Sequence, residues 1–334
     1  MNNISDISIY LILGYPRSGT TWLASLFNTH PDVIYRHEMI GRCYMDFPDD
    51  LFKKLKYDYQ LSDDDYLKVL KIILSPNVES DRAPFFAKRH LLIPSPKLHY
   101  ILWVAARTVY FLKPLYKLLY QPRGNKLSLV IKETRSTMNM DSIIQSIRSK
   151  KNIILFRHPC GAIASALNGI KNGNMTPSTI EDREYWFSEN KARDYIKALS
   201  PDTNLIRDLP EHEYLALRWR QQNEDYLEFK NQDMDNIYIH YEDFMANQEK
   251  SSKALFKLLS LAYVESVEEF IQISSGQSHH KPILKDSSSS YYSVYRSQGF
   301  NPNHWRQSLS SEEISGIEQY TLGIFEDLVR MKSL

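Results

Sequence analysis

A short apolar run, a loop bounded by two glycines and a helical pattern follow one another near the start of the chain. Residues 7–13 read ISIYLIL, Gly14 and Gly19 bound the loop, and residues 20–29 predict a helix, which Pro31 ends. A loop of this kind between a buried strand and a helix turns its backbone N–H groups, and the positive end of the helix dipole, toward one place. The sequence therefore predicts an anion site at the first strand–helix junction of an α/β fold.

This loop differs from the nucleotide-binding P-loop, G-x-x-x-x-G-K-[ST], at one position. Thr20 stands where the P-loop has lysine, and a basic residue, Arg17, lies inside the loop instead. The P-loop lysine holds the terminal phosphates of a nucleoside triphosphate, so its absence predicts a different phosphate ligand. The hydroxyl groups of Ser18, Thr20 and Thr21 are candidate additional donors to that ligand.

Three later apolar runs, each followed by a helical pattern, continue the strand–helix alternation. The runs are residues 127–132, 152–157 and 236–241, and the helical patterns are residues 141–150, 160–170 and 251–261. Such alternation predicts a parallel sheet covered by helices on both faces, which is an α/β three-layer sandwich. A length of 334 residues is compatible with one domain of this class, so we expect a single domain over residues 1–334.

Residues 44–125 interrupt the alternation and predict a helical insertion. Within it, residues 99–120 are apolar and aromatic, but Arg107, Lys113, Lys117 and Pro114 argue against a membrane span. We expect this segment to be helical and packed over the sheet. Two alternatives are a helix on a membrane surface and a helix that binds a partner.

The charge and the cysteines limit the classes of partner and compartment. The formal net charge is +1, so no global field attracts nucleic acid or membrane, and an anion site must be built locally. Cys43 and Cys160 form no CxxC pair, and the first residues do not resemble a signal peptide, so we expect a cytoplasmic protein. The pair His279–His280 lacks companion ligands at useful spacing, and no metal is expected.

The first loop, YPRSGTTWL, resembles the 5′-phosphosulfate-binding loop of the sulfotransferase family. This resemblance implies a P-loop-like fold and 3′-phosphoadenosine 5′-phosphosulfate (PAPS) as sulfuryl donor, with no metal required. Cytosolic members usually have lysine where this chain has Arg17, whereas tyrosylprotein and many carbohydrate members have arginine. The donor has no β- and γ-phosphates, so a P-loop lysine would have nothing to hold.

A second segment, LFRHPCGAIASAL, is similar to the family's 3′-phosphate motif, R-x-P-x-x-x-x-x-S. Arg157 ends a predicted strand, Pro159 lies near a helix start, and Ser165 follows eight residues after the arginine. An arginine fork suits a terminal phosphate because it donates two parallel charge-assisted hydrogen bonds. Together with the first loop, the motif favours a nucleotide with phosphates at both ends.

Two further contributions to the nucleotide site follow from the resemblance. The segment YRSQGFNPNHW is similar to the late R-K-G…W segment that closes over the 3′-phosphate and adenine, which makes Arg296 and Gly299 candidates, although Ser297 replaces the lysine. Trp22 corresponds to a residue that stacks on adenine in cytosolic members. Its alternative is a tryptophan of the hydrophobic core.

The resemblance also implies a base and cations between the two phosphate motifs. Glu38 lies twenty-one residues after Arg17, as does the glutamate that is thought to take the acceptor proton in tyrosylprotein and carbohydrate members. The rivals for this role are Glu133, near the position of the cytosolic catalytic histidine, and His37. Lys132 matches the lysine that family members place near the sulfonate, and Arg17 supplies a second cation.

Two other segments resemble structural parts of the family. We interpret the acidic pair of YED (residues 241–243) as structural, His240 as a packed strand-end histidine, and SSEE (residues 310–313) as a capping box.

The sequence thus predicts a PAPS-dependent sulfotransferase that acts on a hydroxyl, less often a nitrogen, of a natural product or a sugar. The alternatives are a P-loop kinase or NTPase, and a catalytically silent scaffold that binds 3′,5′-adenosine bisphosphate (PAP). The insertion is the expected source of acceptor specificity.

Overall fold

The structure is a computed structural model of the chain. It describes residues 7–57, 61–124, 126–134, 140–190, 193, 195–196, 204–228, 235–276, 291, 293–295 and 301–334. Arg296 and Gly299, named above as candidate site residues, lie outside the described residues, as does the pair at 279–280 for which no metal was expected.

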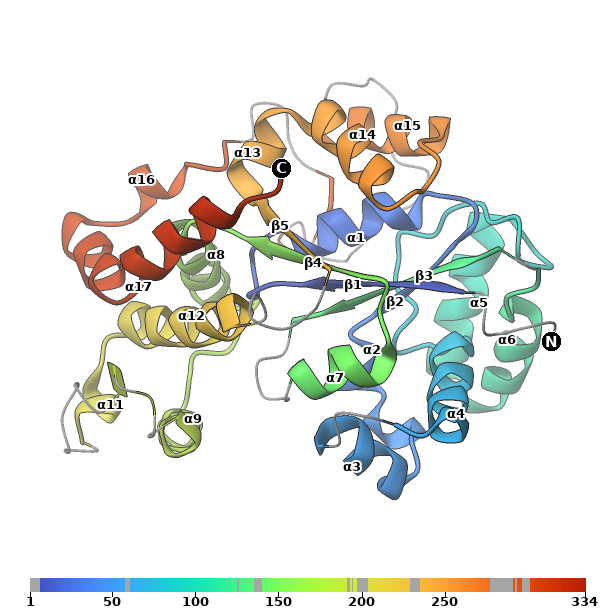
Figure 1. Ribbon diagram of the computed structural model, residues 1–334, viewed down its shortest axis with the longest axis horizontal. Coiled ribbons are helices and arrows are strands. Elements are labelled where there is room, and N and C mark those ends of the chain that lie inside the picture. Colours follow the sequence, from blue (N-terminus) through green and yellow to red (C-terminus); the bar gives the residue numbers. More distant parts are fainter. Residues whose placement is uncertain are drawn as a thin grey trace.

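The centre of the molecule is a parallel sheet of five strands in the order β2-β3-β1-β4-β5 (Figure 1). The strands are β1 (Ser8–Leu13), β2 (Val33–His37), β3 (Ser128–Glu133), β4 (Lys151–Phe156) and β5 (Asn236–His240). They are short and almost entirely buried, which is typical of a parallel sheet covered on both faces. The register aligns Leu13 with Glu133 and with Ile154, so the carboxyl ends of the three central strands meet at one edge.

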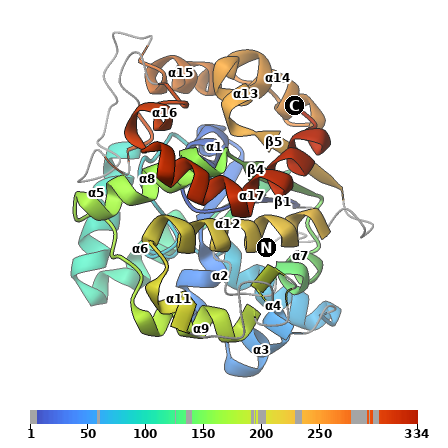
Figure 2. The ribbon, with the colours of Figure 1, turned by 90° about the vertical axis from the view of Figure 1, so that its left-hand side faces the viewer.

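Helices cover both faces of the sheet, as the strand–helix alternation predicts. On one face, Tyr10 and Ile12 pack with α1 (Thr20–Asn28), α14 (Gln248–Leu258) and α15 (Glu265–Ser274). On the other, Leu11 and Leu13 pack with residues of the helices α3 (Asp49–Tyr57), α4 (Asp63–Leu74), α7 (Met140–Ile147), α12 (Glu211–Glu228) and α17 (Ser311–Met331). Figure 2 shows α12 and α17 side by side, in agreement with their extensive contact. Alternate residues of one strand therefore serve two separate cores.

The described chain forms further helices, some of which also add residues to these cores. They are α2 (Met39–Arg42), α5 (Pro96–Thr108), α6 (Lys113–Tyr120), α8 (Pro159–Lys171), α9 (Ile180–Asn190), α11 (Asn204–Asp208), α13 (Tyr241–Ala246) and α16 (Trp305–Ser308), with the 3-10 turns η2 (Tyr44–Asp46) and η3 (Tyr110–Leu112).

One strand, β2, was not predicted. The helix before it ends at Asn28, close to the predicted end, but the chain then forms an edge strand instead of remaining in a loop. Arg36 and His37 interrupt the apolar pattern, yet both side chains are buried. The Arg36 guanidinium donates to Asp81 Oδ1 at 2.7 Å and to the carbonyl oxygens of Ile73 and Leu74, so partners from elsewhere in the chain make its burial possible.

The apolar segment within residues 99–120 is helical, as expected, but it forms two helices. α5 ends before Val109, whose backbone is extended, and α6 begins after η3 with Pro114 in its first turn. Ala106 of α5 packs with Tyr116 and Tyr120 of α6 in a small core of their own. None of the described helices combines the length and apolarity needed to cross a bilayer.

Candidate active site

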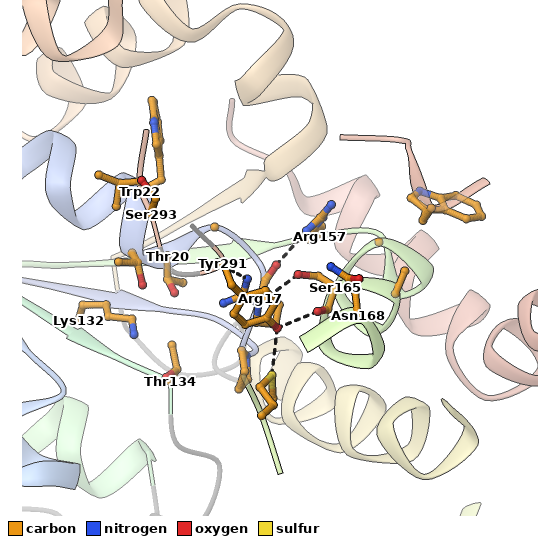
Figure 3. A pocket seen from close by; sticks show the side chains of 18 of the residues that line it. Arg17, Thr20, Trp22, Lys132, Thr134, Arg157, Ser165, Asn168, Tyr291 and Ser293 are labelled. Atoms are coloured by element: carbon orange, nitrogen blue, oxygen red, sulfur yellow. Dashed lines mark hydrogen bonds between the residues drawn. The ribbon is translucent and has the colours of Figure 1, made fainter. Parts of the chain in front are cut away.

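A pocket of about 490 Å³ opens at the carboxyl edge of the sheet. Its walls come from the loops that follow four strands, which the fold brings together at this edge. Its polar lining includes Arg17, Thr20 and Thr21 after β1, Glu38 after β2, Lys132 and Thr134 at the end of β3, and Arg157, Ser165 and Asn168 after β4. Figure 3 shows Arg17 between Lys132 and Thr134 on one side and Arg157 and Ser165 on the other.

The loop after β1 presents the N-terminus of α1 to this pocket. Gly19 is the N-cap, with φ of 92°, and a Cβ atom there would lie 2.4 Å from the Tyr241 ring, so only glycine fits. The Leu23 N–H donates to the Gly19 carbonyl at 3.1 Å. The N–H groups of Thr20 and Thr21 lie one turn earlier, where α1 has no backbone acceptor for them and no side-chain cap. Such a helix end attracts an anion.

Arg17 joins the two predicted phosphate motifs. Its Nε donates to Ser165 Oγ at 3.1 Å, and its Nη2 donates to the Tyr291 carbonyl at 3.2 Å. The guanidinium also lies 4.0 Å from the centre of the Tyr291 ring, whose hydroxyl donates to the Ser165 carbonyl at 2.7 Å. Arg17 has a φ of 72°, a left-handed conformation that is uncommon for a residue other than glycine. The side chain of Ser165 and the ring and carbonyl of Tyr291 thus hold the Arg17 cation in the pocket.

Arg157 is held at the end of the pocket where α8 begins. Its Nη1 donates to the Arg17 carbonyl and its Nη2 to the Pro302 carbonyl, each at 3.1 Å. Its Nε lies 3.6 Å from Glu242 Oε1, and a Cβ atom at Gly161 would lie 2.9 Å from the same Nε. The guanidinium is therefore oriented by backbone groups on both sides, while one carboxylate supports it from behind.

A buried ion pair lies at the opposite end of the pocket. Lys132 Nζ donates to Glu38 Oε1 at 2.5 Å, and Thr134 Oγ1 donates to the same oxygen at 2.8 Å. Burial lowers the pKa of Lys132, and the Glu38 carboxylate beside it opposes this effect. Glu38 has a φ of 49°, and its N–H donates to the Lys132 carbonyl at 2.7 Å. The backbone therefore fixes this carboxylate at the pocket wall.

Glu133, the rival base, has a different position. It neighbours Lys132 in the strand, so its side chain points to the other face, and it is not among the residues that line the pocket. Glu133 Oε1 accepts from the Ile40 N–H at 2.7 Å, at the start of α2. Burial raises the pKa of Glu133 to about 7.

His37 and Arg82 complete the pocket beside Glu38. The Tyr35 hydroxyl and His37 Nδ1 are 2.7 Å apart, and His37 Nε2 lies 3.2 Å from Arg82 Nη1 and 3.9 Å from Glu38 Oε2. Because a guanidinium only donates, His37 Nε2 is the acceptor in its contact with Arg82. Arg82 comes from the predicted insertion, and sequence reasoning missed it.

Two predicted nucleotide-binding residues have side chains that serve the protein interior. Ser18 is fully buried and is not among the pocket-lining residues, and its N–H donates to the Tyr15 carbonyl at 3.1 Å. Trp22 contributes to the pocket wall, but its indole N–H donates to Ser274 Oγ at 3.0 Å and its ring packs on Phe270. In Figure 3 the Trp22 ring points away from Arg17.

The YED segment has contacts that fit a structural role. Besides Arg157, Glu242 pairs with His240 at 3.0 Å, and Asp243 pairs with Lys332 at 2.9 Å. His240 stacks on Phe156 with ring centres 5.3 Å apart. The predicted capping box is present: Ser310 and Glu313 exchange hydrogen bonds at the start of α17.

The pocket matches a doubly phosphorylated nucleotide in size and charge. Its volume falls within the usual range for small-molecule sites, about 300–1,000 Å³. Among the described lining residues, four are cationic and only Glu38 is acidic. Arg157 and Arg17, with Ser165 and the α1 N-terminus, would hold the two phosphate ends of PAPS. Thr134, Asn168 and Tyr291 were not predicted, since no motif contains them and only the fold brings them here.

Comparison with known proteins identifies the family of this chain. The description "Sulfotransferase family" belongs to a family model that matches residues 10–265. Similar solved structures include a sulfotransferase domain from the curacin biosynthetic pathway, at 15% identity over 97% of this chain and 98% of that one, with a TM-score of 0.42. Mouse SULT7A1 complexed with PAP has 15% identity over 97% and 85%, with a TM-score of 0.46.

A third similar structure is STF9 from Mycobacterium avium, at 13% identity over 98% of this chain and 78% of that chain, with a TM-score of 0.43. No curated protein sequence matches this chain. The family match covers most of the chain and includes both phosphate motifs, Lys132 and Glu38. The chain therefore belongs to the sulfotransferase family and is a PAPS-dependent sulfotransferase.

Proposed function

We propose that this enzyme transfers the sulfuryl group of PAPS to a hydroxyl of a small-molecule natural product or a sugar, with Glu38 as the base. One observation carries the proposal: a single pocket has the Arg157 and Ser165 phosphate motif at one end and the Glu38–Lys132 pair at the other, with Arg17 between them. We assign the activity to the cytoplasm, since both cysteines are free thiols.

The strand order supports one orientation of PAPS in the pocket. β4, β1, β3 and β2 are successive neighbours in the sheet. Arg157, Arg17, Lys132 and Glu38 lie at or just after the ends of these strands, so they follow one another along its edge. A donor with its 3′-phosphate at Arg157 and its 5′-phosphate at the α1 N-terminus would direct its sulfonate toward Lys132. The acceptor would then enter from the β2 side, where Glu38, His37 and Arg82 lie.

The chemistry requires one proton transfer and one displacement. The acceptor hydroxyl gives its proton to the Glu38 carboxylate while its oxygen forms a bond to sulfur. The bond from sulfur to the bridging oxygen breaks, and its electron pair stays on the 5′-phosphate of PAP. Lys132 and Arg17 stabilise the charge that develops on the transferring group and on the leaving oxygen. An amine acceptor would use the same groups.

Acceptor choice belongs, in this proposal, to the part of the pocket that the insertion supplies. Arg82 lies at the acceptor end, where its Nη1 contacts His37, and it forms no ion pair with a carboxylate within the described part of the chain. An acceptor with an acidic or strongly polar group beside its reacting hydroxyl would give this guanidinium a partner.

Two alternatives have less support. A kinase or NTPase would need a lysine at Thr20 to hold terminal phosphates, and the loop has none. A silent PAP-binding scaffold gives no reason for a carboxylate that is paired with a buried lysine at the wall of the same pocket.

The proposal is tested by incubating the enzyme with PAPS and a panel of hydroxylated metabolites and sugars, with product mass spectrometry. We expect a gain of one SO₃ on an acceptor hydroxyl and stoichiometric release of PAP, both lost in Glu38→Gln. Transfer of phosphate from Mg²⁺–ATP without any use of PAPS would overturn the proposal. PAPS binding without transfer to any acceptor would favour the silent scaffold.

A further inference from the structure

The charged residues of this chain are unevenly distributed. Between residues 83 and 132 the sequence contains nine lysine and arginine residues and no aspartate or glutamate. The chain as a whole has a net charge of only +1, so the rest of it is acidic. This cationic stretch includes α5, η3 and α6, residues 96–120, which we call the α5–α6 segment.

The same stretch also exposes an unusual number of large apolar side chains. Of the fifteen large hydrophobic residues that are exposed in the described part of the chain, eight lie between residues 92 and 118. They are Leu92, Leu98, Ile101, Val104, Tyr110, Phe111, Leu115 and Leu118. Tyr110 and Phe111, in the turn between the helices, are 81% and 77% exposed. Apolar patches of this kind on a folded protein mark interaction sites.

Packing within the chain leaves all eight of these residues exposed. The inner side of the segment is already filled, because Ala106, Tyr116 and Tyr120 are buried against one another. In α5, Leu98, Ile101 and Val104 recur every three residues, so they share the outward face. A helix that keeps an apolar face outward after its inner face is buried has a second surface to bind.

Exposed cations accompany the apolar side chains. Lys97 and Arg107 of α5 and Lys117 of α6 are exposed, and none of them forms an ion pair with a carboxylate in the ranges that the structure describes. Arg107 lies over the Trp103 ring at 4.7 Å, and Lys113 lies over the Tyr110 ring at 5.2 Å. Their charges remain available to an anionic partner.

We propose that the α5–α6 segment binds the enzyme to the surface of an anionic phospholipid membrane. Aliphatic and aromatic side chains would enter the region between headgroups and acyl chains, while the cations remain at the level of the lipid phosphates. A protein partner fits less well, because lysine is depleted in protein interfaces and this surface has three lysines on flexible stems. Lipid phosphates are mobile and need no fixed geometry of the cation, so the flexible ammonium groups of lysine suit them.

The segment lies on the membrane and does not enter it as a span. α5 has 13 residues and α6 has 8, and both are much shorter than the roughly 20 residues that cross a bilayer. Figure 1 shows both helices at the side of the molecule opposite α16 and α17. Arg82, at the acceptor end of the pocket, also lines a smaller cavity with His99 of α5 and Tyr120 of α6. Binding would therefore bring that end of the pocket, and not the Arg157 end, toward the lipid.

The experiment is flotation of the full chain with vesicles, which needs no knowledge of the acceptor. The vesicles are phosphatidylcholine alone and phosphatidylcholine with phosphatidylglycerol. We expect binding to the anionic vesicles at least tenfold stronger than to the neutral ones, and weaker binding as salt rises. The double variant Y110S/F111S removes the most exposed apolar side chains, and we expect about tenfold weaker binding.

A charge variant and its matched control show whether binding depends on the charges of the α5–α6 segment or on the net charge of the protein. K97E/K117E is expected to weaken binding to anionic vesicles by at least tenfold. K250E/K257E makes the same charge change at exposed lysines of α14, and it is expected to bind within twofold of the unchanged protein. Circular dichroism and retained PAP binding show that each variant is folded.

Three outcomes would overturn the proposal. The first is no binding to either kind of vesicle, which would leave an acidic protein as the partner. The second is equal loss of binding in K97E/K117E and K250E/K257E, which would mean that only the net charge matters. The third is unchanged binding in both α5–α6 variants.

Discussion

The two candidate bases make opposite predictions for two conservative substitutions. Glu38→Gln and Glu133→Gln each replace a buried carboxylate by an amide of the same shape. In Glu38→Gln the amide oxygen can still accept from Lys132 and Thr134, so the pocket keeps its form. In Glu133→Gln the amide oxygen can still accept from the Ile40 N–H.

The expected magnitudes follow from what each carboxylate touches. Glu38 lines the pocket, and loss of a general base lowers kcat by about 10²–10⁴, or about 3–5 kcal/mol of transition-state free energy. The hydrogen bond from Lys132 changes from charge-assisted to one with a neutral acceptor, so the free energy of unfolding should fall by about 1–2 kcal/mol. Glu133→Gln touches no pocket atom, and kcat should stay within about threefold.

The assay is release of PAP from saturating PAPS in the presence of an acceptor, with urea unfolding of the same preparations. PAP affinity within about threefold of the unchanged protein shows that Glu38→Gln acts on the chemical step. Equal activity in the two variants, or a greater loss in Glu133→Gln, would refute the assignment of Glu38 as the base.

Three further predictions concern the loop, the buried carboxyl group and the acceptor end. In Gly19→Ala, the Cβ atom would lie 2.4 Å from the Tyr241 ring at a φ of 92°, so urea unfolding should show a loss of about 2 kcal/mol or more, and a stable variant would contradict this. The pKa of the Glu133 carboxyl group is 4.5 in the unfolded chain and about 7 in the folded protein. The stability that protonated Glu133 contributes is therefore fully present below pH 4.5, and up to about 3 kcal/mol of it is lost as pH rises through 7. Denaturation at several pH values should show this fall, and Glu133→Gln should lose it. Arg82→Ala should raise KM for the acceptor at least tenfold with KM for PAPS unchanged, and steady-state kinetics showing the reverse would place Arg82 at the donor.

Most of the sheet could be predicted because its strands are short apolar runs followed by helices. Four of the five strands lie where the pattern predicts them. β2 was missed because a buried arginine and histidine make its sequence resemble a surface segment. The partners of Arg36, Asp81 and the carbonyl groups at the end of α4, come from about forty residues away, and no local pattern shows them.

The candidate site was predictable where one loop carries a complete motif. Arg17, Thr20 and Thr21 lie at the pocket because the strand–loop–helix geometry fixes them, and the strand ends bring Lys132 and Arg157 to the same edge. Pocket side chains that belong to no recognised motif were not predictable.

Arg82 reaches the site through the fold of residues 44–125, and Tyr291 through a late segment of the chain. The positions of Glu38 and Glu133 in the sequence could not decide which of them is the base. Neighbouring residues of strands and loops point to different faces, and only the structure shows which carboxylate lines the pocket.

The central claim is that two anion sites in one pocket hold the two phosphate ends of one adenosine nucleotide. Isothermal titration tests it with PAP and with adenosine 5′-monophosphate, which lacks the 3′-phosphate, on the unchanged protein and on Arg157→Ala. We predict one-to-one binding of PAP at micromolar concentration, at least 100-fold weaker in Arg157→Ala, and weak binding of the monophosphate that Arg157→Ala leaves nearly unchanged. Equal affinity for both nucleotides, or an equal loss of both in Arg157→Ala, would contradict the claim.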